Sequence, residues 1–579
     1  MLHFWFMSHD PNKPIIVQSD RSILLETDGP CFEDARDSIA AFAELVKSPE
    51  HIHTYRISPL SLWNAAASGM TADEIIGRLR RFSRYEIPEN VIVDVRDNVS
   101  RYGRLKLFKK EVGGDLVLYS DDALLIVQIL NQKSLQPYLH GSADGHHIYV
   151  RPEDRGNVKC ALIKLGFPVE DLAGYVEGAP LEIELRKVTR GGNPFDLRKY
   201  QKESVDAFHL NGSNQGGSGV VVLPCGAGKT CVAIGAIAKL KTQTLVLTTN
   251  TVALRQWKNE LLDKTTLSED QIGEYSGDSK EIRPVTLATY QVLTYRKAKD
   301  SPFVHFSLFD EGNWGLIVYD EVHLLPAPVF RATAALQARR RLGLTATLVR
   351  EDAREDDVFS LIGPKKYDVP WKVLEKQGWI AQALCTEIRV QLPADERYRY
   401  AISDKRGKFR IASTNPVKAS VCEMLINRHK TDNVLIIGQY LDQLKVLAKR
   451  FSAPIITGQT ANRKREELYS AFRTGACKLL IVSKVANFAI DLPDANVAIQ
   501  VSGTFGSRQE EAQRLGRILR PKSDGTIARF YSLVSRDTCD HDYSQKRQLF
   551  LTEQGYRYEI KNSDELVIEE TPAKSVENA

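Results

Sequence analysis

Residues 221–230 read Val-Val-Leu-Pro-Cys-Gly-Ala-Gly-Lys-Thr, an apolar run followed by a glycine-rich turn. The apolar run predicts a buried strand, and a helix is expected to begin near Lys229. Gly226 and Gly228 let the backbone of the turn point its N–H groups at a phosphate, where the helix N-terminus adds positive potential. Lys229 could reach the β- and γ-phosphates of a nucleotide, and the Thr230 hydroxyl could ligate Mg²⁺. The stretch therefore predicts a nucleotide-binding loop in an α/β fold.

The generic phosphate-loop pattern has glycine where this chain has Leu223, so the glycine-rich turn could have arisen by chance. Two adjacent carboxylates further along the chain argue against that alternative. The sequence Leu-Ile-Val-Tyr-Asp-Glu-Val-His at 316–323 is an apolar strand that ends in Asp320 and Glu321. At the carboxyl edge of a parallel sheet, Asp320 could hold Mg²⁺ while Glu321 orients and deprotonates the attacking water. An exposed acidic turn would explain the pair alone. The loop and the pair in this order predict an NTPase.

Short apolar runs alternate with helical stretches from about Pro194 onward, which is typical of parallel sheets buried on both faces. Two sets of strands are predicted. The first set is Val220–Leu223, Thr244–Thr248, Val285–Thr289, Leu316–Tyr319 and Leu342–Thr345. The second set is Val434–Ile437, Leu479–Val482, Val497–Val501 and Ile527–Tyr531. We therefore predict two parallel-sheet domains in series.

The first 190 residues have a different pattern. Residues 59–97 predict three short helices, the second opened by a capping box at Thr71-x-x-Glu74. A strand-like stretch, Arg104–Phe108, follows, so the segment 59–110 could be a winged helix, a common DNA-reading module. Residues 118–185 indicate a small α+β unit. The polar, acidic tail from Ser563 is expected to be disordered.

Composition narrows the class of protein. A chain of 579 residues is too long for one core. None of its eight cysteines forms a CxxC pair, which argues against a disulfide framework or a zinc or iron–sulfur cluster. No apolar run approaches the roughly 20 residues needed to cross a membrane. The net charge of +5 permits a polyanionic partner without requiring one.

A second candidate catalytic group lies in the stretch 509–520. As a helix, this stretch would place Gln513, Arg517 and Arg520 on one face, because they are spaced i, i+4 and i+7. Two arginines on one face could reach a γ-phosphate across a domain cleft and stabilise transition-state charge. The alternative is a solvated basic helix paired with Glu510 and Glu511.

These stretches, in this order, resemble the motif series of superfamily 2 helicases. The phosphate loop resembles motif I, Asp320–His323 the DEVH form of motif II, Thr345-Ala-Thr347 motif III, and Gln513–Arg520 motif VI. Gln201 resembles the residue that reads adenine in this class. In a DEVH setting, His323 would connect the ATP site to Gln513 or Thr345.

Two features make the resemblance specific to the XPB family of repair helicases, and residues 8–115, with stretches such as Pro14-Ile-Ile-Val-Gln-Ser-Asp20, resemble its bacterial branch. Pro224-Cys225-Gly226-Ala227-Gly228-Lys229-Thr230 matches that family's motif I, which accounts for the missing generic glycine. Arg350-Glu351-Asp352 resembles its RED motif, which is associated with strand separation. One departure is Ala486-Asn487 in motif V, where many relatives have Gly-Asp; this puts DNA contact at 486–487 in doubt.

The resemblance implies two RecA-like parallel-sheet motor domains in tandem, preceded by smaller N-terminal α+β domains. The expected division is an N-terminal domain at 1–116, a damage-recognition-like domain at 117–189, motor domains at 190–365 and 366–560, and a tail at 561–579. The family also carries a basic thumb insertion, expected here as a strand-like projection within about 393–420. Its basic side chains could follow a phosphate backbone, although a solvated hairpin is the alternative; they are Lys405, Arg406, Lys408 and Arg410.

By this resemblance the chain is an ATP- and Mg²⁺-dependent 3′-to-5′ DNA helicase acting in repair on single-stranded and duplex or forked DNA. We expect a cytoplasmic, nucleoid-associated monomer with no membrane contact, and a nuclease partner is left open. A duplex translocase that opens DNA only locally, a non-enzymatic DNA-binding scaffold and an RNA helicase are the alternatives. A translocase would use the same motor residues as a helicase, so the sequence does not separate the two. Contacts to the 2′-hydroxyl distinguish RNA from DNA, and the sequence does not reveal such contacts.

Overall fold

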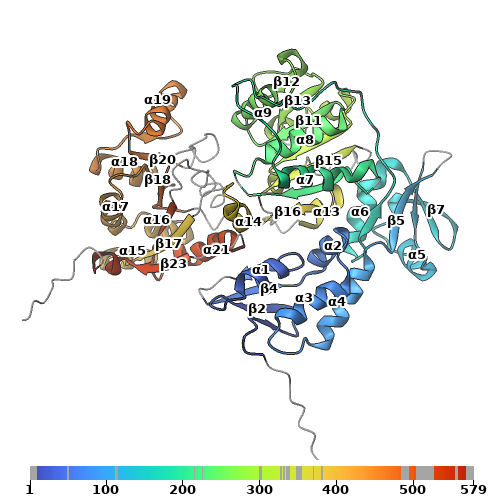
Figure 1. Ribbon diagram of the computed structural model, residues 1–579, viewed down its shortest axis with the longest axis horizontal. Coiled ribbons are helices and arrows are strands. Elements are labelled where there is room, and N and C mark those ends of the chain that lie inside the picture. The colour runs from blue at the N-terminus through green and yellow to red at the C-terminus, as the bar shows by residue number, and fades with distance from the viewer. Residues whose placement is uncertain are drawn as a thin grey trace, which may run out of the picture. The chain divides into compact units, whose positions relative to one another are not determined.

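The structure is a computed structural model whose chain forms two compact units, with the main division between Val369 and Pro370 (Figure 1). It describes residues 10–47, 51–110, 115–213, 215–224, 226–298, 301, 303–326, 329, 333, 339–346, 355–369, 371–379, 383–483, 495–503, 527–553 and 558–568. Within these residues, no helix is both long enough and apolar enough to span a membrane.

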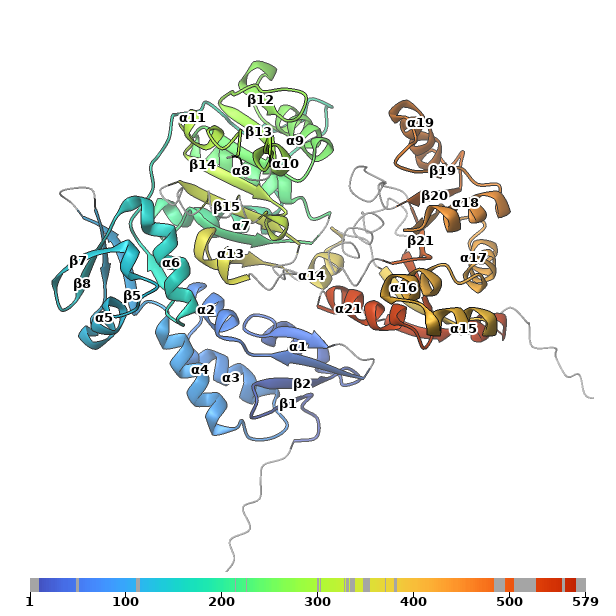
Figure 2. The same ribbon diagram turned by 180° about the vertical axis from the view of Figure 1, so that it is seen from behind.

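The chain opens with a four-stranded sheet followed by three helices. The sheet has the order β1-β2-β4-β3, and Figure 2 shows it beside α3 and α4. The capping box predicted at Thr71 is confirmed: Glu74 N donates to Thr71 Oγ1 at 3.2 Å, and Thr71 N donates to Glu74 Oε2 at 2.8 Å. The elements are β1 (Ile15–Val17), β2 (Ser22–Glu26), α1 (Phe32–Ile39), β3 (Glu44–Lys47), β4 (Ile52–Arg56), α2 (Pro59–Ala67), α3 (Ala72–Phe82) and α4 (Glu89–Arg101).

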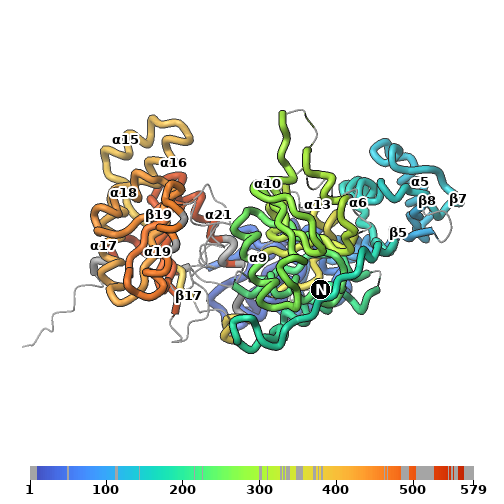
Figure 3. The backbone as a smooth tube through the Cα atoms, turned by 90° about the horizontal axis from the view of Figure 1, so that it is seen from above, coloured from blue at the N-terminus to red at the C-terminus, as the bar shows by residue number. Residues whose placement is uncertain are grey.

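A five-stranded sheet follows, in the order β7-β8-β6-β5-β9, and Figure 3 shows it beside α5 and α6. Its elements are β5 (Leu105–Lys109), β6 (Leu116–Tyr119), α5 (Ala123–Leu130), β7 (Leu139–Asp144), β8 (His147–Val150), α6 (Arg155–Lys164) and β9 (Val169–Asp171). The strand predicted as a wing is β5, and it pairs with β6 and β9. The winged-helix interpretation and the boundary at 116 are therefore wrong, because the pairing of β5 starts a new sheet at Leu105.

Sheet domain 1, residues 199–368, is a seven-stranded parallel sheet in the order β12-β13-β11-β14-β15-β10-β16. All five strands predicted here are present, and four-fifths or more of each is fully buried. The elements are α7 (Lys199–His209), β10 (Ser218–Val222), α8 (Lys229–Leu240), β11 (Thr244–Thr248), α9 (Thr251–Lys264), β12 (Ile272–Tyr275), β13 (Val285–Thr289), α10 (Tyr290–Leu293), α11 (Leu308–Glu311), β14 (Leu316–Asp320), β15 (Arg340–Thr345), α13 (Glu355–Leu361) and β16 (Lys365–Asp368).

Sheet domain 2, residues 371–568, is a second seven-stranded parallel sheet, in the order β19-β20-β18-β21-β22-β17-β23. All four strands predicted here are present. The elements are α14 (Trp371–Lys376), β17 (Ala383–Val390), α15 (Ala394–Ile402), α16 (Lys405–Ser413), α17 (Val417–Arg428), β18 (Val434–Gly438), α18 (Leu441–Arg450), β19 (Ile455–Ile456), α19 (Asn462–Arg473), β20 (Leu479–Ser483), β21 (Val497–Gln500), β22 (Ala528–Ser535), α21 (Cys539–Glu553), β23 (Tyr558–Asn562) and α22 (Ser563–Ile568).

Three expectations need correction here. The basic stretch expected as a strand-like projection is helical, because Asp404 caps α16 by accepting from Gly407 N at 2.8 Å and the apolar Phe409 and Ala412 are buried at helical spacing. The boundary at 365 would cut β16, which pairs with β10 in sheet domain 1. The tail expected to be disordered begins as β23 and α22, since β23 pairs with β17 along five residues.

An extended segment, residues 177–186, joins the five-stranded sheet to sheet domain 1. Its backbone bonds to loops of that domain: Ala179 N donates to Asn313 O at 2.9 Å, Leu181 N to Lys241 O at 2.9 Å, and Arg186 N to Lys264 O at 2.9 Å. Gly315 lies where this segment passes, and a Cβ at Gly315 would overlap the Glu177 carbonyl oxygen and the Thr242 side chain. The close approach of the two backbones therefore requires glycine at 315.

We expect Gly315→Ala to lower the free energy of unfolding by about 2 kcal/mol or more, because the added methyl group must push the joining segment away. Gly277→Ala is the matched control, since a Cβ at Gly277 would meet nothing within 4 Å. Urea unfolding followed by tryptophan fluorescence compares the two. Equal midpoints would show that the segment does not press on Gly315.

Candidate active site

The phosphate loop, the carboxylate pair and the motif III residues follow three neighbouring strands. In sheet domain 1, β15 lies between β10 and β14, with Val222 opposite Thr345 and Asp320 opposite Leu344. Because all three strands are parallel and in register, their carboxyl ends meet at one edge of the sheet. Stretches separated by about 90 residues in the sequence are therefore brought together, as the order of motifs predicted.

The phosphate loop has the backbone that its glycines predicted. Gly226 and Gly228 have φ angles of +83° and +78°, a region that favours glycine, and α8 begins at Lys229. Pro224 is buried at the end of the strand, and Ala227 is buried in the turn. Thr230 is in the first turn of α8. Cys225 lies outside the described residues.

Gln201 lies against this loop. It is buried in the first turn of α7, and a Cβ at Gly228 would stand only 2.6 Å from its Nε2 atom. Its Oε1 atom accepts a hydrogen bond from Arg198 N at 2.9 Å, which fixes the start of α7. The residue expected to read adenine is thus held beside the phosphate loop, and its contact with a base stays a prediction.

The carboxylates face the lysine of the loop. Lys229 Nζ lies 3.5 Å from Glu321 Oε1, and both side chains are largely buried. Glu321 has a left-handed backbone, with φ 49° and ψ 56°, which is uncommon for a residue with a side chain and typical of functional turns. The turn aims Glu321 back toward α8 rather than along the strand.

Asp320 is held by two aromatic residues, which the sequence analysis did not predict. Trp257 Nε1 on α9 donates to Asp320 Oδ2 at 2.9 Å, and Tyr290 Oη donates to the Asp320 carbonyl oxygen at 2.9 Å. Burial, with the negative charge of Glu321, raises the pKa of Asp320 to about 6, while the Trp257 hydrogen bond and Lys229 oppose the rise. The two hydrogen bonds fix Asp320 in one orientation.

His323 connects the carboxylate pair to motif III. Its buried ring places Nδ1 2.6 Å from Thr345 Oγ1 at the end of β15 and 3.5 Å from Glu321 Oε2. The prediction that His323 reaches Thr345 agrees with this geometry. Glu321, His323 and Thr345 therefore form one chain of side-chain contacts.

The donor set fits Mg²⁺. A carboxylate at Asp320 and a hydroxyl at Thr230 are hard oxygen ligands, and Mg²⁺ usually takes one or two carboxylates together with substrate phosphates and waters. Within the described part of the chain, no cluster of three or more His, Cys, Asp or Glu side chains is arranged to hold a metal without a nucleotide.

The remaining predicted residues lie either outside the described residues or in sheet domain 2. Two predicted motifs lie outside the described residues: motif VI, with Gln513, Arg517 and Arg520, and the RED motif, with Arg350, Glu351 and Asp352. Lys405, Arg406, Lys408 and Arg410 lie on α16 of sheet domain 2.

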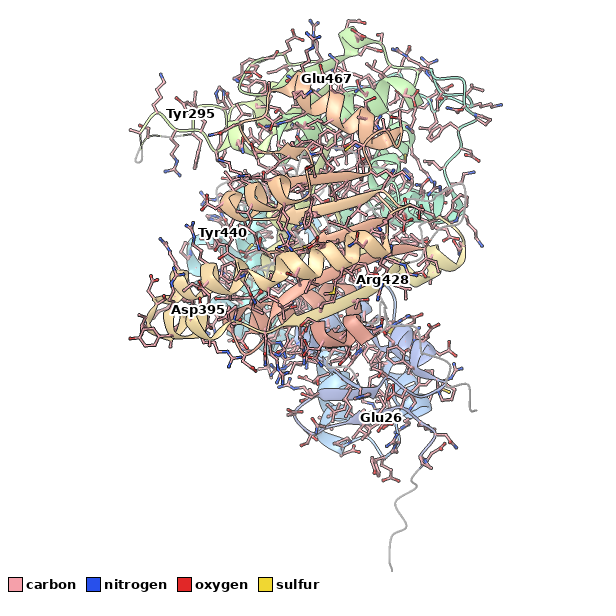
Figure 4. All side chains as sticks on the ribbon, turned by 90° about the vertical axis from the view of Figure 1, so that its left-hand side faces the viewer. Glu26, Tyr295, Asp395, Arg428, Tyr440 and Glu467 are labelled. Atoms are coloured by element: carbon pink, nitrogen blue, oxygen red, sulfur yellow. The ribbon has the colours of Figure 1, made fainter. Side chains whose placement is uncertain are left out.

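On α16 the basic side chains are mostly exposed, and only two have described partners. Arg410 pairs with Asp442 at 2.5 Å and stacks over Tyr440, and Lys408 lies over the ring of Tyr400. Figure 4 labels Asp395 in α15, Arg428 at the end of α17 and Tyr440 just before α18, which mark the helices that neighbour α16 in the sequence.

The chain has two parallel sheets in tandem. One edge of the first sheet carries a phosphate loop, two adjacent carboxylates and a histidine that contacts motif III. This combination defines the nucleotide-driven motors of helicase superfamily 2. Residues 374–578 match the family described as ERCC3/RAD25/XPB C-terminal helicase. Residues 15–143 match a helicase conserved C-terminal domain, and residues 194–350 match the type III restriction enzyme res subunit.

Three relatives cover nearly the whole chain. The DNA 3′-5′ helicase XPB of Kineococcus radiotolerans is 56% identical, over 96% of this chain and 97% of the relative. The protein of the same description from Mycobacterium tuberculosis is 53% identical, over 96% and 98%. The general transcription and DNA repair factor IIH helicase/translocase subunit XPB of Encephalitozoon cuniculi is 35% identical, over 94% and 82%. The chain belongs to the XPB family of superfamily 2 helicases.

We expect Trp257→Phe to raise the Mg²⁺ concentration needed for half-maximal ATP turnover by about tenfold, because Asp320 loses the partner that orients it. Since that hydrogen bond lowers the pKa of Asp320, its loss also moves the acid limb of the pH profile to higher pH. Trp314→Phe is the control: Trp314 is an equally buried indole of the same domain that donates to Leu308 O at 2.9 Å. An identical Mg²⁺ dependence in both variants would refute a role for Trp257.

Proposed function

We propose that this chain is an ATP-driven 3′-to-5′ DNA helicase that couples hydrolysis in sheet domain 1 to movement along DNA and opening of the duplex. The observation that carries this function is the contact between Lys229 and Glu321 at the shared edge of β10, β15 and β14. The curated bacterial relatives, both DNA 3′-5′ helicases by name, support the direction and the substrate.

Each residue at the edge has a chemical task in this scheme. Lys229 neutralises the β- and γ-phosphates, and its departure from Glu321 leaves that carboxylate to accept a proton from the attacking water. Asp320 and Thr230 would hold Mg²⁺, which neutralises charge on the phosphates when bound. Arg517 and Arg520, with Gln513, would stabilise the transition state from sheet domain 2.

Movement follows if His323 reports the state of the γ-phosphate. A shift of Glu321 alters its contact with His323, and the hydrogen bond to Thr345 transmits the shift to the strand end that precedes Arg350-Glu351-Asp352. We assign strand separation to those three residues. The exposed cations of α16, Lys405, Arg406 and Arg410, would follow the phosphate backbone with Lys408.

On the same family grounds we propose a monomeric motor that acts on nucleoid DNA in the cytoplasm, with a nuclease as its candidate partner. A second function is a duplex translocase that opens DNA only locally. It is favoured by the description of the Encephalitozoon cuniculi relative as a helicase/translocase subunit. Both functions require the same ATP site, so strand displacement separates them.

We expect ATP-dependent displacement from a duplex with a 3′ single-stranded tail and none from a 5′-tailed duplex. Lys229→Ala should abolish displacement and ATP turnover while largely sparing DNA binding, because Lys229 lies at the phosphate loop, where its contacts are with the phosphates and with Glu321. Lys239→Ala is the matched control, since Lys239 lies at the other end of α8 and pairs with Asp206 at the surface.

DNA-stimulated ATP turnover without displacement from either tail would favour the translocase. Displacement from the 5′ tail, or normal turnover by Lys229→Ala, would contradict the proposed function.

A further inference from the structure

A network of polar side chains is buried at the carboxyl ends of three neighbouring strands of sheet domain 2. The strands β21, β22 and β17 are adjacent and parallel, so their carboxyl ends meet at one edge of the sheet. The network joins this edge to α21 and to the start of α17. We call it the strand-end network, and its members are Asn415, Lys418, Ser535, Asp540 and Arg547.

Three charged side chains form the centre of the network. Lys418 Nζ donates to Asp540 Oδ2 at 3.0 Å, and Arg547 Nη2 donates to Asp540 Oδ1 at 3.4 Å, with all three side chains only 1% exposed. Burial alone would raise the pKa of Asp540, but the charges of Lys418 and Arg547 lower it, so the carboxylate stays ionised. Apolar side chains of the same size would often stabilise a fold equally well, so stability alone does not account for three buried charges.

The two cations of the network hold the end of β21. Lys418 Nζ also donates to the Val501 carbonyl oxygen at 3.0 Å, directly after the strand. The Arg547 guanidinium lies against Gly503, where a Cβ would stand only 2.4 Å from the Cζ atom of the arginine. The backbone that leaves β21 is therefore fixed by two buried cations. In the sequence, this backbone leads to motif VI.

The remaining members connect the same edge to α16. Ser535 is the last residue of β22, and its hydroxyl donates to the Ala412 carbonyl oxygen near the end of α16 at 2.6 Å. The same hydroxyl accepts from Asn415 Nδ2 at 3.1 Å, and the backbone N–H of Ser535 donates to Asp540 Oδ2 at 3.2 Å. Ser535 therefore links the backbone of α16 to the charged centre of the network.

The helix α21 provides a second path from α16 to the end of β21. Phe409 of α16 meets Tyr543 of α21 edge-on, with ring centroids 5.2 Å apart, and Figure 2 shows the two helices side by side. Tyr543 and Arg547 are four residues apart on α21, so they share one face of that helix. A shift of α16 would thus act on the end of β21 both through Ser535 and through α21.

We propose that the strand-end network transmits the contact of α16 with DNA to the end of β21, so that DNA stimulates ATP turnover. This inference rests on the proposed function, in which α16 follows the phosphate backbone with its exposed cations, Lys405, Arg406 and Arg410. The network is polar, buried and hydrogen-bonded throughout, which makes it a rigid link. Its members are positioning residues, because they act through the strand end and not on the nucleotide.

The substitution Ser535→Ala tests the link, because it removes the hydroxyl that reaches α16 and leaves Lys418 and Asp540 to hold β21. ATP turnover by the full chain is measured with and without a saturating single-stranded oligonucleotide. The variant should lose stimulation by DNA by about fivefold or more, which corresponds to a typical coupling between two sites. Its turnover without DNA, its KM for ATP and its affinity for the oligonucleotide should stay those of the unaltered chain.

The matched control is Ser532→Ala, which should keep full stimulation. Ser532 is buried on the same strand, but three residues separate it from Ser535, so it faces the other side of the sheet. The midpoint of thermal unfolding is measured for both variants, and turnover is compared at a temperature where both are folded.

Stimulation retained by Ser535→Ala would overturn the link and leave the proposed function intact. An equal fall in turnover with and without DNA would give Ser535 a structural role alone, and would also overturn the link. If DNA does not stimulate the unaltered chain, the proposed function fails and the link fails with it.

Discussion

The position of β15 between β10 and β14 is the constraint on which the ATP site depends. Their parallel register brings three strand ends, and therefore Lys229, Glu321 and Thr345, to one edge. Each of these side chains contacts the next one through a buried or largely buried atom: Lys229 meets Glu321, Glu321 meets His323, and His323 meets Thr345. A strand inserted or slipped by one residue would break this chain of contacts, because alternate residues face opposite sides of the sheet.

The same sheet connects the ATP edge to the rest of the first unit. Its other end carries Arg341 and Ser218, which are paired in the sheet, and the Arg341 guanidinium donates to Ser218 Oγ at 3.0 Å. β15 thus has Thr345 at its carboxyl end, in contact with His323, and Arg341 near its start, electrostatically coupled to Asp171 and Tyr175. β15 is buried along all but its first residue, and such a strand is well suited to transmit changes between its two ends, since packed cores deform little.

Continuous apolar runs made nine strands predictable, but the short edge strands carry no such signal. β16, with the sequence Lys-Lys-Tyr-Asp, is an example. The pairing of β5 with β6 and β9 is a long-range event that local pattern cannot reveal, and it replaced the expected wing. At the site, spacing and chemistry predicted Lys229 and Glu321, and the resemblance to the DEVH motif predicted the link from His323 to Thr345. Trp257 was missed because a lone tryptophan on a helix is usually core, and only the fold shows that its indole meets Asp320.

The central claim is that Glu321 activates the water that attacks ATP, and Glu321→Gln tests it most directly. Steady-state ATP turnover should fall by about 10²- to 10⁴-fold, because an amide cannot take the proton. Titration with a fluorescent ATP analogue should give an affinity close to that of the unaltered chain, since Lys229 and the loop still bind the phosphates. Loss of turnover with ATP binding retained is the predicted result. Turnover within a few-fold of the unaltered chain would contradict the account.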